Sequence, residues 1–167
     1  MLLRHAKAEP ESLAGDFTRS LTEAGRQQAS RLGKHLYELR LFPQSIYSSS
    51  AHRALETASL ICEQLDIDDK QIGVRDDLYL AGIDTYLSLL TQLDPRYTRV
   101  MLVGHNPALE DVLQFLSNKP VASDLDNGKL MLPATLLTLS FNNDWSALGA
   151  HSCELDSRLH GKRLTGA

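Results

Sequence analysis

The chain has 167 residues, a length that fits one domain with a substantial buried core. Its hydrophobic fraction of 43% excludes whole-chain disorder, and its net charge of −4 argues against a nucleic-acid partner, which would normally require a basic face. No apolar stretch approaches the length of about 20 residues that spans a bilayer, and the first residues lack the apolar core of a signal peptide. We therefore expect one cytoplasmic domain over residues 1–167, with no membrane partner.

Hydrophobic spacing in the first half predicts strands that alternate with helices. Residues 1–4 are apolar and stop abruptly, as at the end of a buried strand. Thr22 is a suitable N-cap for a helix that runs to residue 41. A strand over residues 45–48 and a helix over residues 51–65 follow, since apolar residues recur there at the matching periods.

The second half continues this alternation. Residues 99–103 form a continuous apolar run, which is typical of a strand covered on both faces. A proline at position 107 favours a helix that begins there. The remaining predictions are a strand at 71–74, helices at 83–93 and 107–116, strands at 136–141 and 145–151, and a frayed tail at 158–167.

These elements predict an α/β fold with three layers, in which helices cover both faces of a mostly parallel sheet. Ligands in such sheets bind beyond the carboxyl ends of the strands. Three polar segments occupy such positions, and they are residues 4–5, 49–53 and 104–106. Each segment alone is weak evidence for a site, but three such segments at strand-to-helix transitions indicate that they form one site.

The residue types at these positions suit phosphoryl transfer. Neutral histidine is a nucleophile near neutral pH, and arginine supplies permanent charge in a planar array suited to phosphate oxygens. Arg4, His5, Arg53 and His105 provide such a set, and a helix that begins after Ser50 would add backbone N–H donors. The sequence has no metal-binding motif and no glycine-rich phosphate loop of the Walker type, so we expect no metal and no cofactor.

Three motifs resemble the signatures of the histidine phosphatase superfamily, which includes cofactor-dependent phosphoglycerate mutases. The first is Leu3-Arg4-His5-Ala6, and the second is the segment 49–58, in which serine and arginine lead into an Ala-x-x-Thr-Ala helix. The third is Val103-Gly104-His105-Asn106-Pro107. In addition, residues 16–25 match an Asp-x-x-Arg-x-Leu-Thr-x-x-Gly segment, which is typical of SixA-type phosphohistidine phosphatases.

This resemblance implies a phosphoglycerate mutase-like fold and a role for each matching residue. His5 would carry the phosphoryl group, while Arg4, Arg53 and His105 would bind its oxygens. Arg19 and Thr22 belong to the shared segment 16–25 and would contact substrate.

The sequence departs from the family pattern at three positions. Ala6 replaces the usual glycine, and Ser50 stands where proline is usual. Many members place a glutamate, the general acid, where this chain has Leu80, and none of Asp76, Asp77 and Asp84 matches that position. An alkoxide leaving group needs a proton, whereas the imidazole of phosphohistidine can leave neutral. The missing acid therefore favours phosphohistidine over phosphomonoesters.

Three functions remain open from the sequence. The first is a phosphatase for phosphohistidine in a protein, and the second is a phosphatase for a small phosphorylated molecule. The third is a non-catalytic module that recognises phosphorylated partners, although binding alone has no need of a nucleophile. The short chain favours a protein substrate, because few residues remain to enclose a small molecule, with residues 119–133 as the main candidate cover. A mutase is disfavoured because it must hold a phosphodonor and reorient the substrate, and the chain lacks the extra segments for this.

Overall fold

A mixed six-stranded sheet forms the centre of the computed structural model, which describes residues 1–10, 13, 15–123 and 128–164. The strand order is β3-β2-β4-β1-β5-β6. The first four strands in this order are parallel, and β5 is antiparallel to both of its neighbours. The strands are β1 (Leu2–Arg4), β2 (Ser45–Ser49), β3 (Ile72–Arg75), β4 (Val100–Gly104), β5 (Thr135–Ser140) and β6 (Glu154–His160). The predicted α/β fold with a mostly parallel sheet is confirmed.

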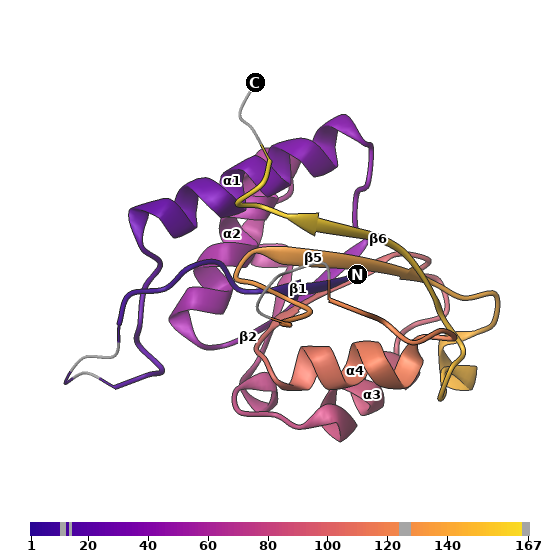
Figure 1. The fold of residues 1–167 in the computed structure, drawn as a ribbon. Coiled ribbons are helices and arrows are strands. Elements are labelled where there is room, and N and C mark those ends of the chain that lie inside the picture. Colours follow the sequence, from indigo (N-terminus) through magenta and orange to yellow (C-terminus); the bar gives the residue numbers. More distant parts are fainter. Residues whose placement is uncertain (11–12, 14, 124–127, 165–167) are drawn as a thin grey trace.

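Helices cover both faces of this sheet, so the structure has the three predicted layers (Figure 1). The helices α1 and α2 lie on one face with Leu32, Ile61 and Cys62 buried between them and the sheet, while α3 and α4 lie on the other. Among the described residues, no helix has the length and apolar character needed to cross a membrane. The helices are α1 (Glu23–Glu38), α2 (His52–Leu65), α3 (Ile83–Thr91) and α4 (Ala108–Leu116).

The parallel strands β2, β4 and β1 are neighbours, and their carboxyl ends meet at one edge of the sheet. Arg4 is paired in register with Gly104, and Ser48 with Val103. The backbone N–H of His5 extends the ladder by donating to the carbonyl of Gly104 at 3.1 Å. The three polar segments predicted from the sequence therefore lie side by side.

The start of α1 fastens the chain just after His5. The Thr22 side chain accepts from the backbone N–H of Gly25, as predicted for an N-cap, and its hydroxyl and N–H both donate to the Lys7 carbonyl. A Cβ on Gly25 would overlap the Lys7 carbonyl oxygen, so this close approach requires glycine. The helix ends at Glu38, three residues earlier than predicted, because Arg40 has a left-handed φ of 55°.

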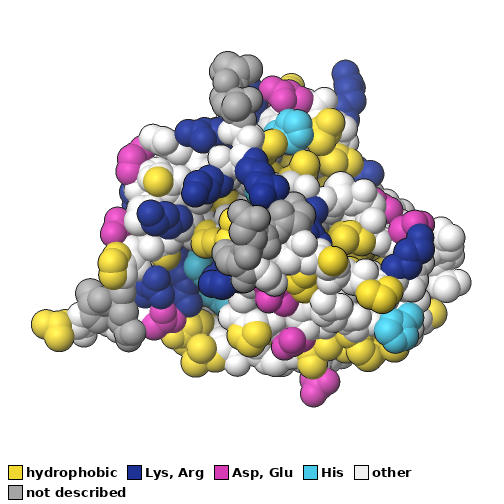
Figure 2. Space-filling model, in the orientation of Figure 1, with side chains coloured by type: hydrophobic (Ala, Val, Ile, Leu, Met, Phe, Trp, Pro, Cys, Tyr) yellow, Lys and Arg dark blue, Asp and Glu magenta, His cyan; other side chains and the backbone are white. Residues whose placement is uncertain are grey.

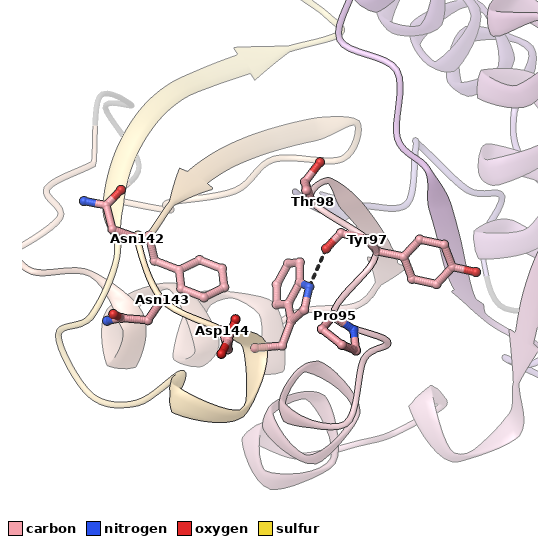
Figure 3. A pocket seen from close by; sticks show the side chains of 8 residues that line it. Pro95, Tyr97, Thr98, Asn142, Asn143 and Asp144 are labelled. Carbon is pink, nitrogen blue, oxygen red and sulfur yellow. Dashed lines mark hydrogen bonds between the residues drawn. The ribbon is translucent and has the colours of Figure 1, made fainter.

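The prediction of a strand over residues 145–151 is wrong. A short 3₁₀ helix, Trp145–Ala147, begins this segment, and His151 has a φ of 58°, which a strand cannot contain. The Trp145 indole N–H donates to the Tyr97 carbonyl at 2.6 Å beside a cavity of about 500 Å³ (Figure 3). This tertiary contact overrides the local strand preference of the segment. The cavity lies at the amino ends of the parallel strands, away from the three motifs.

The tail predicted to fray is ordered over most of its length. The first three residues of this tail, residues 158–160, belong to β6, which pairs with β5, and the His160 ring bonds the Thr135 hydroxyl at 2.8 Å. After them, the Gly161 N–H donates to the Ala134 carbonyl and the Leu164 N–H to the His160 carbonyl. Residues 165–167 lie outside the described part of the chain.

Candidate active site

His5, Arg53 and His105 meet at the carboxyl edge of the sheet. The Arg53 Nε–H donates to His5 Nε2 at 3.3 Å, and the rings of His5 and His105 lie 5.1 Å apart. His5 and Arg53 are buried, with 9% and 5% of their surfaces exposed. Dark-blue basic side chains and cyan histidine gather around a hollow on the face drawn in Figure 2. The structure thus brings together the residues that the three motifs predicted.

The hydrogen bonds of His5 determine which ring nitrogen is free to react. Nδ1 lies 2.8 Å from the Ala6 carbonyl oxygen, which can only accept, so Nδ1 carries the proton. Nε2 therefore has an unshared electron pair and accepts from Arg53. Such a ring is a nucleophile whose attacking atom faces a cation.

The surroundings of both histidines favour their neutral forms. Burial, together with the nearby His105, Arg53 and Arg4, lowers the pKa of His5 to about 3, although the Ala6 carbonyl opposes this shift. Burial and Arg53 lower the pKa of His105 to about 4. A phosphoryl dianion among these residues would raise both pKa values, so substrate binding would make His105 a better donor.

These pKa values predict how stability changes with pH. Below the ordinary pKa of 6.5, the unfolded chain binds a proton at His5 that the folded chain refuses down to about pH 3, so the unfolding free energy falls as pH falls. The variant His5→Asn should show a shallower fall between pH 6.5 and 4, by up to about 1.4 kcal/mol per pH unit. Urea unfolding across this range measures the slope. A slope in His5→Asn equal to that of the wild type would contradict the prediction.

Several buried polar atoms around these histidines have no hydrogen-bond partner within the described structure. They are Arg4 Nε, Ser50 Oγ, His105 Nδ1 and Asn106 Oδ1. Arg4 is held by a 2.7 Å bond from NH1 to the Met131 carbonyl, which leaves its Nε available. Orphaned buried donors are costly. A bound anion with several acceptor oxygens would satisfy the arginine, the serine and the histidine together.

His105 is oriented by Ser49, which the sequence analysis did not single out. His105 Nε2 lies 2.8 Å from the Ser49 hydroxyl, which also accepts from the Ala51 N–H at 3.3 Å. The Ser49 hydroxyl can donate to His105 Nε2 or accept from it, so this contact holds the ring without fixing its tautomer. The other ring nitrogen, Nδ1, has no protein partner in the described structure.

The predicted backbone donors at the start of α2 are used largely inside the protein. The helix begins at His52, whose N–H donates to the Phe17 carbonyl at 3.1 Å, and the Ala51 N–H is taken by Ser49. The helix dipole still directs partial positive charge toward the site. Anion binding here depends on side chains more than the sequence suggested.

Asp16 is the central residue that the sequence analysis missed as a functional group. Arg53 NH2 donates to its Oδ2 at 2.8 Å, Arg53 NH1 donates to its backbone carbonyl at 2.7 Å, and Arg19 NH1 donates to Oδ1 at 2.7 Å. The Tyr79 hydroxyl donates to Oδ2 at 3.1 Å. The bond from Arg19, with Arg53 and Tyr79, lowers the pKa of Asp16 to about 2, so this carboxylate stays ionised.

In this structure Arg19 and Thr22, the two residues predicted to contact substrate, bond to residues other than His5. Arg19 reaches Asp16 and the Glu9 carbonyl, and Thr22 caps α1. Their contacts in this structure position the loop that carries Asp16 and the segment after His5. Direct contact with substrate remains a prediction for both.

Thr57 and Glu56 explain the polar part of the second motif. The Thr57 hydroxyl accepts from the Ala6 N–H at 3.0 Å and donates to the Arg53 carbonyl at 2.6 Å, which joins the first and second motifs. Glu56 accepts from the Leu21 N–H and from Arg26 Nε. The signature therefore fixes the position of Arg53 relative to His5.

The position expected for a general acid is occupied by an exposed apolar residue. Leu80 is 81% exposed and has a φ of 56°. Nearby, Asp77 forms an exposed ion pair with Arg75, which lowers the pKa of the Asp77 carboxyl. Within the described ranges, no group of three or more histidine, cysteine or acidic side chains is arranged to hold a metal ion.

The segment 119–133 is only partly described. Its Met131 accepts from Arg4 and Asn106 through its carbonyl, and its N–H donates to Glu110. Residues 124–127 lie outside the described structure, so its role as a cover remains a prediction.

Comparisons with known proteins identify the family of this chain. A family model described as "Histidine phosphatase superfamily (branch 1)" matches residues 1–79. Two solved structures, each described as a "putative phosphohistidine phosphatase SixA", are similar to the whole arrangement. The Agrobacterium tumefaciens protein is 38% identical, over 68% of this chain and 72% of its own, with a TM-score of 0.63. The Nakamurella protein is 26% identical, over 95% of this chain and 94% of its own, with a TM-score of 0.76.

A curated relative shares a shorter segment. The serine/threonine-protein phosphatase Pgam5 of Drosophila melanogaster is 39% identical over 57 residues, which are 34% of this chain and 20% of the relative. The match thus spans about a fifth of that protein's length.

Proposed function

Since the chain belongs to the histidine phosphatase superfamily and is a phosphatase of its SixA type, we propose that it removes phosphoryl groups from phosphohistidine in a protein. The observation that carries this proposal is the state of His5. Its Nδ1 proton is bound by the Ala6 carbonyl, and its unprotonated Nε2 faces Arg53. A module that only binds phosphate has no use for a nucleophile prepared in this way.

The reaction has two steps at His5. Nε2 uses its electron pair to form a bond to phosphorus while the bond from phosphorus to the substrate imidazole breaks, and its electrons return to that ring. Water then attacks the phosphorus of phospho-His5 and forms a P–O bond, while the bond from phosphorus to Nε2 breaks and its electrons return to the His5 ring. The proton that water loses passes to the leaving phosphate or to solvent, and inorganic phosphate is released. We expect Arg4, Arg53 and His105 to hold the phosphoryl oxygens in both steps, because Arg4 Nε and His105 Nδ1 are buried without a partner in the described structure and Arg53 contacts Nε2 of His5.

The preference for an N–P bond follows from the carboxylate beside the nucleophile. Asp16 contacts the arginine that bonds His5, and its pKa of about 2 leaves it without a proton to donate. An alkoxide leaving group needs such a proton, and its absence costs about 10² to 10⁴-fold in rate. Imidazole can leave with a proton already on its other nitrogen.

The test compares two substrates on the same carrier domain, one bearing phosphohistidine and the other phosphoserine. EDTA is present, and His5→Ala is the control enzyme. We expect kcat/KM to be at least about 100-fold higher for phosphohistidine, with no release by the variant. Faster hydrolysis of phosphoserine would overturn the proposal in favour of a phosphomonoesterase. Tight binding without phosphate release would instead indicate a recognition module.

A further inference from the structure

Two further aromatic side chains continue the row of rings that begins with the two reactive histidines. The Tyr79 ring lies 6.0 Å from the His105 ring, and the Phe17 ring lies 5.0 Å from the Tyr79 ring at 81°. Because the His105 ring lies 5.1 Å from the His5 ring, the four rings form a row that begins at His5 and ends at Phe17. We call Phe17 and Tyr79 the aromatic wall.

The aromatic wall is held against the catalytic arginine by short hydrogen bonds. Tyr79 donates its hydroxyl proton to Asp16 Oδ2, the same oxygen that accepts from Arg53 NH2. Phe17 directly follows Asp16, and its carbonyl accepts from the His52 N–H. A displacement of the Tyr79 ring would therefore disturb the carboxylate that binds Arg53, so this hydrogen bond couples the position of Tyr79 to that of Arg53.

The wall leaves apolar surface open to solvent. Phe17 is 37% exposed, and Leu80, which follows Tyr79, is 81% exposed with a left-handed backbone. A left-handed backbone is unfavourable for leucine, and the exposed side chain gains no burial that would compensate for it. Apolar and aromatic groups beside the charged residues of the site favour contact with the apolar part of a substrate.

We propose that the aromatic wall is a leaving-group subsite, in which Phe17 and Tyr79 contact the planar ring attached to the transferred phosphoryl group. This inference rests on the proposed function and deepens it. The phosphoryl oxygens occupy the arginine donors, and the ring on the far side of phosphorus lies against the wall. Tyr79 and Phe17 are thus specificity-determining residues that select a flat imidazole over a non-planar leaving group.

The test uses pairs of small phosphates that differ in the ring. Phosphoimidazole and phosphoramidate both contain an N–P bond, but only the first has a ring; phenyl phosphate and phosphoserine form the matching O–P pair. In Phe17→Leu and Tyr79→Leu, the ratio of kcat/KM for the ring substrate to that for its partner should fall about 3- to 10-fold, the size of one aromatic contact. Differences in the intrinsic reactivity of the four compounds do not affect this test, because each variant's ratio of kcat/KM values is divided by the wild-type ratio for the same pair.

Two further variants separate specificity from structure. Tyr79→Phe keeps the ring and loses the bond to Asp16, so it should keep the wild-type ratio. Phe42→Leu removes an exposed ring that packs on Tyr37 elsewhere and should change neither substrate. An equal loss for both members of a pair in the wall variants would overturn the subsite.

The outcomes also distinguish the subsite from the proposed function. Wild-type turnover of phenyl phosphate with a wall-dependent ratio, but none of either N–P compound, would refute the phosphohistidine function and keep the subsite. Turnover of phosphoimidazole with unchanged ratios in the wall variants would keep the function and refute the subsite. Turnover of none of the four compounds would overturn both.

Discussion

Replacing His5 by asparagine should lower kcat for phosphohistidine by at least about 1,000-fold. Asparagine can donate to the Ala6 carbonyl as Nδ1 does, but it has no electron pair able to attack phosphorus in place of Nε2. The first covalent step is then lost, while the arginine donors remain. Stopped assays of phosphate release over a range of enzyme concentrations measure this loss.

The matched measurement for this variant is binding of inorganic phosphate by calorimetry. Binding within about threefold of wild type would show that Arg4, Arg53 and His105 keep their places, since a threefold change is under 1 kcal/mol. Near-wild-type kcat in a correctly folded His5→Asn protein would exclude His5 as the nucleophile.

Replacing Arg53 by lysine should lower kcat/KM by about 100- to 1,000-fold, the usual effect of removing one donor to developing charge. The guanidinium bonds His5 Nε2, the Asp16 carboxylate and the Asp16 carbonyl at once. A lysine ammonium is a point charge at the end of a flexible stem and cannot hold all three acceptors. The steady-state kinetics of the purified variant measure the effect.

Arg19→Lys is the matched control, because Arg19 bonds the other oxygen of the same carboxylate and lies farther from His5. Its side chain is 25% exposed, against 7% for Arg53. A loss smaller than about tenfold is expected there, since exposed ion pairs contribute little. Similar losses in the two variants would mean that Arg53 acts through the loop rather than on the phosphoryl group.

The location of the site could be predicted from the sequence because it depends on local rules. The sequence predicts strands over residues 1–4, 45–48 and 99–103, and parallel strands place their carboxyl ends at one edge of the sheet. The register of β1 with β4 then brings His5 beside His105. The Ala-x-x-Thr-Ala motif accounts for the position of Arg53 relative to the first motif, since the Thr57 hydroxyl bonds both Ala6 and Arg53.

Asp16 and Tyr79 could not be placed from spacing alone. They lie 63 residues apart in the chain and meet only because two loops fold over the carboxyl edge of the sheet. The Asp-x-x-Arg spacing of residues 16 and 19 was a visible signal, but it gave no reason to connect Asp16 with Arg53. The surface that borders His5 therefore required the tertiary structure.

The antiparallel pairing of β5 with β6 and the segment between them also could not be predicted from the sequence. Pairing of β6 with β5 orders polar residues that have no apolar periodicity of their own, and the positive φ of His151 ends a segment that resembled a strand. Sheet pairing and turn geometry decided both segments, and neither can be read from composition.

The most direct test of the account is to trap the covalent intermediate. Wild-type protein is mixed with a phosphohistidine-bearing domain in EDTA, quenched in base within milliseconds, and digested, and phosphorylated peptides are then identified by mass spectrometry. The account predicts a transient phosphoryl group on the peptide that contains His5, on the His5 ring, and none in His5→Asn. Phosphate release with no phosphorylation of His5, or with phosphorylation of another residue, would contradict it.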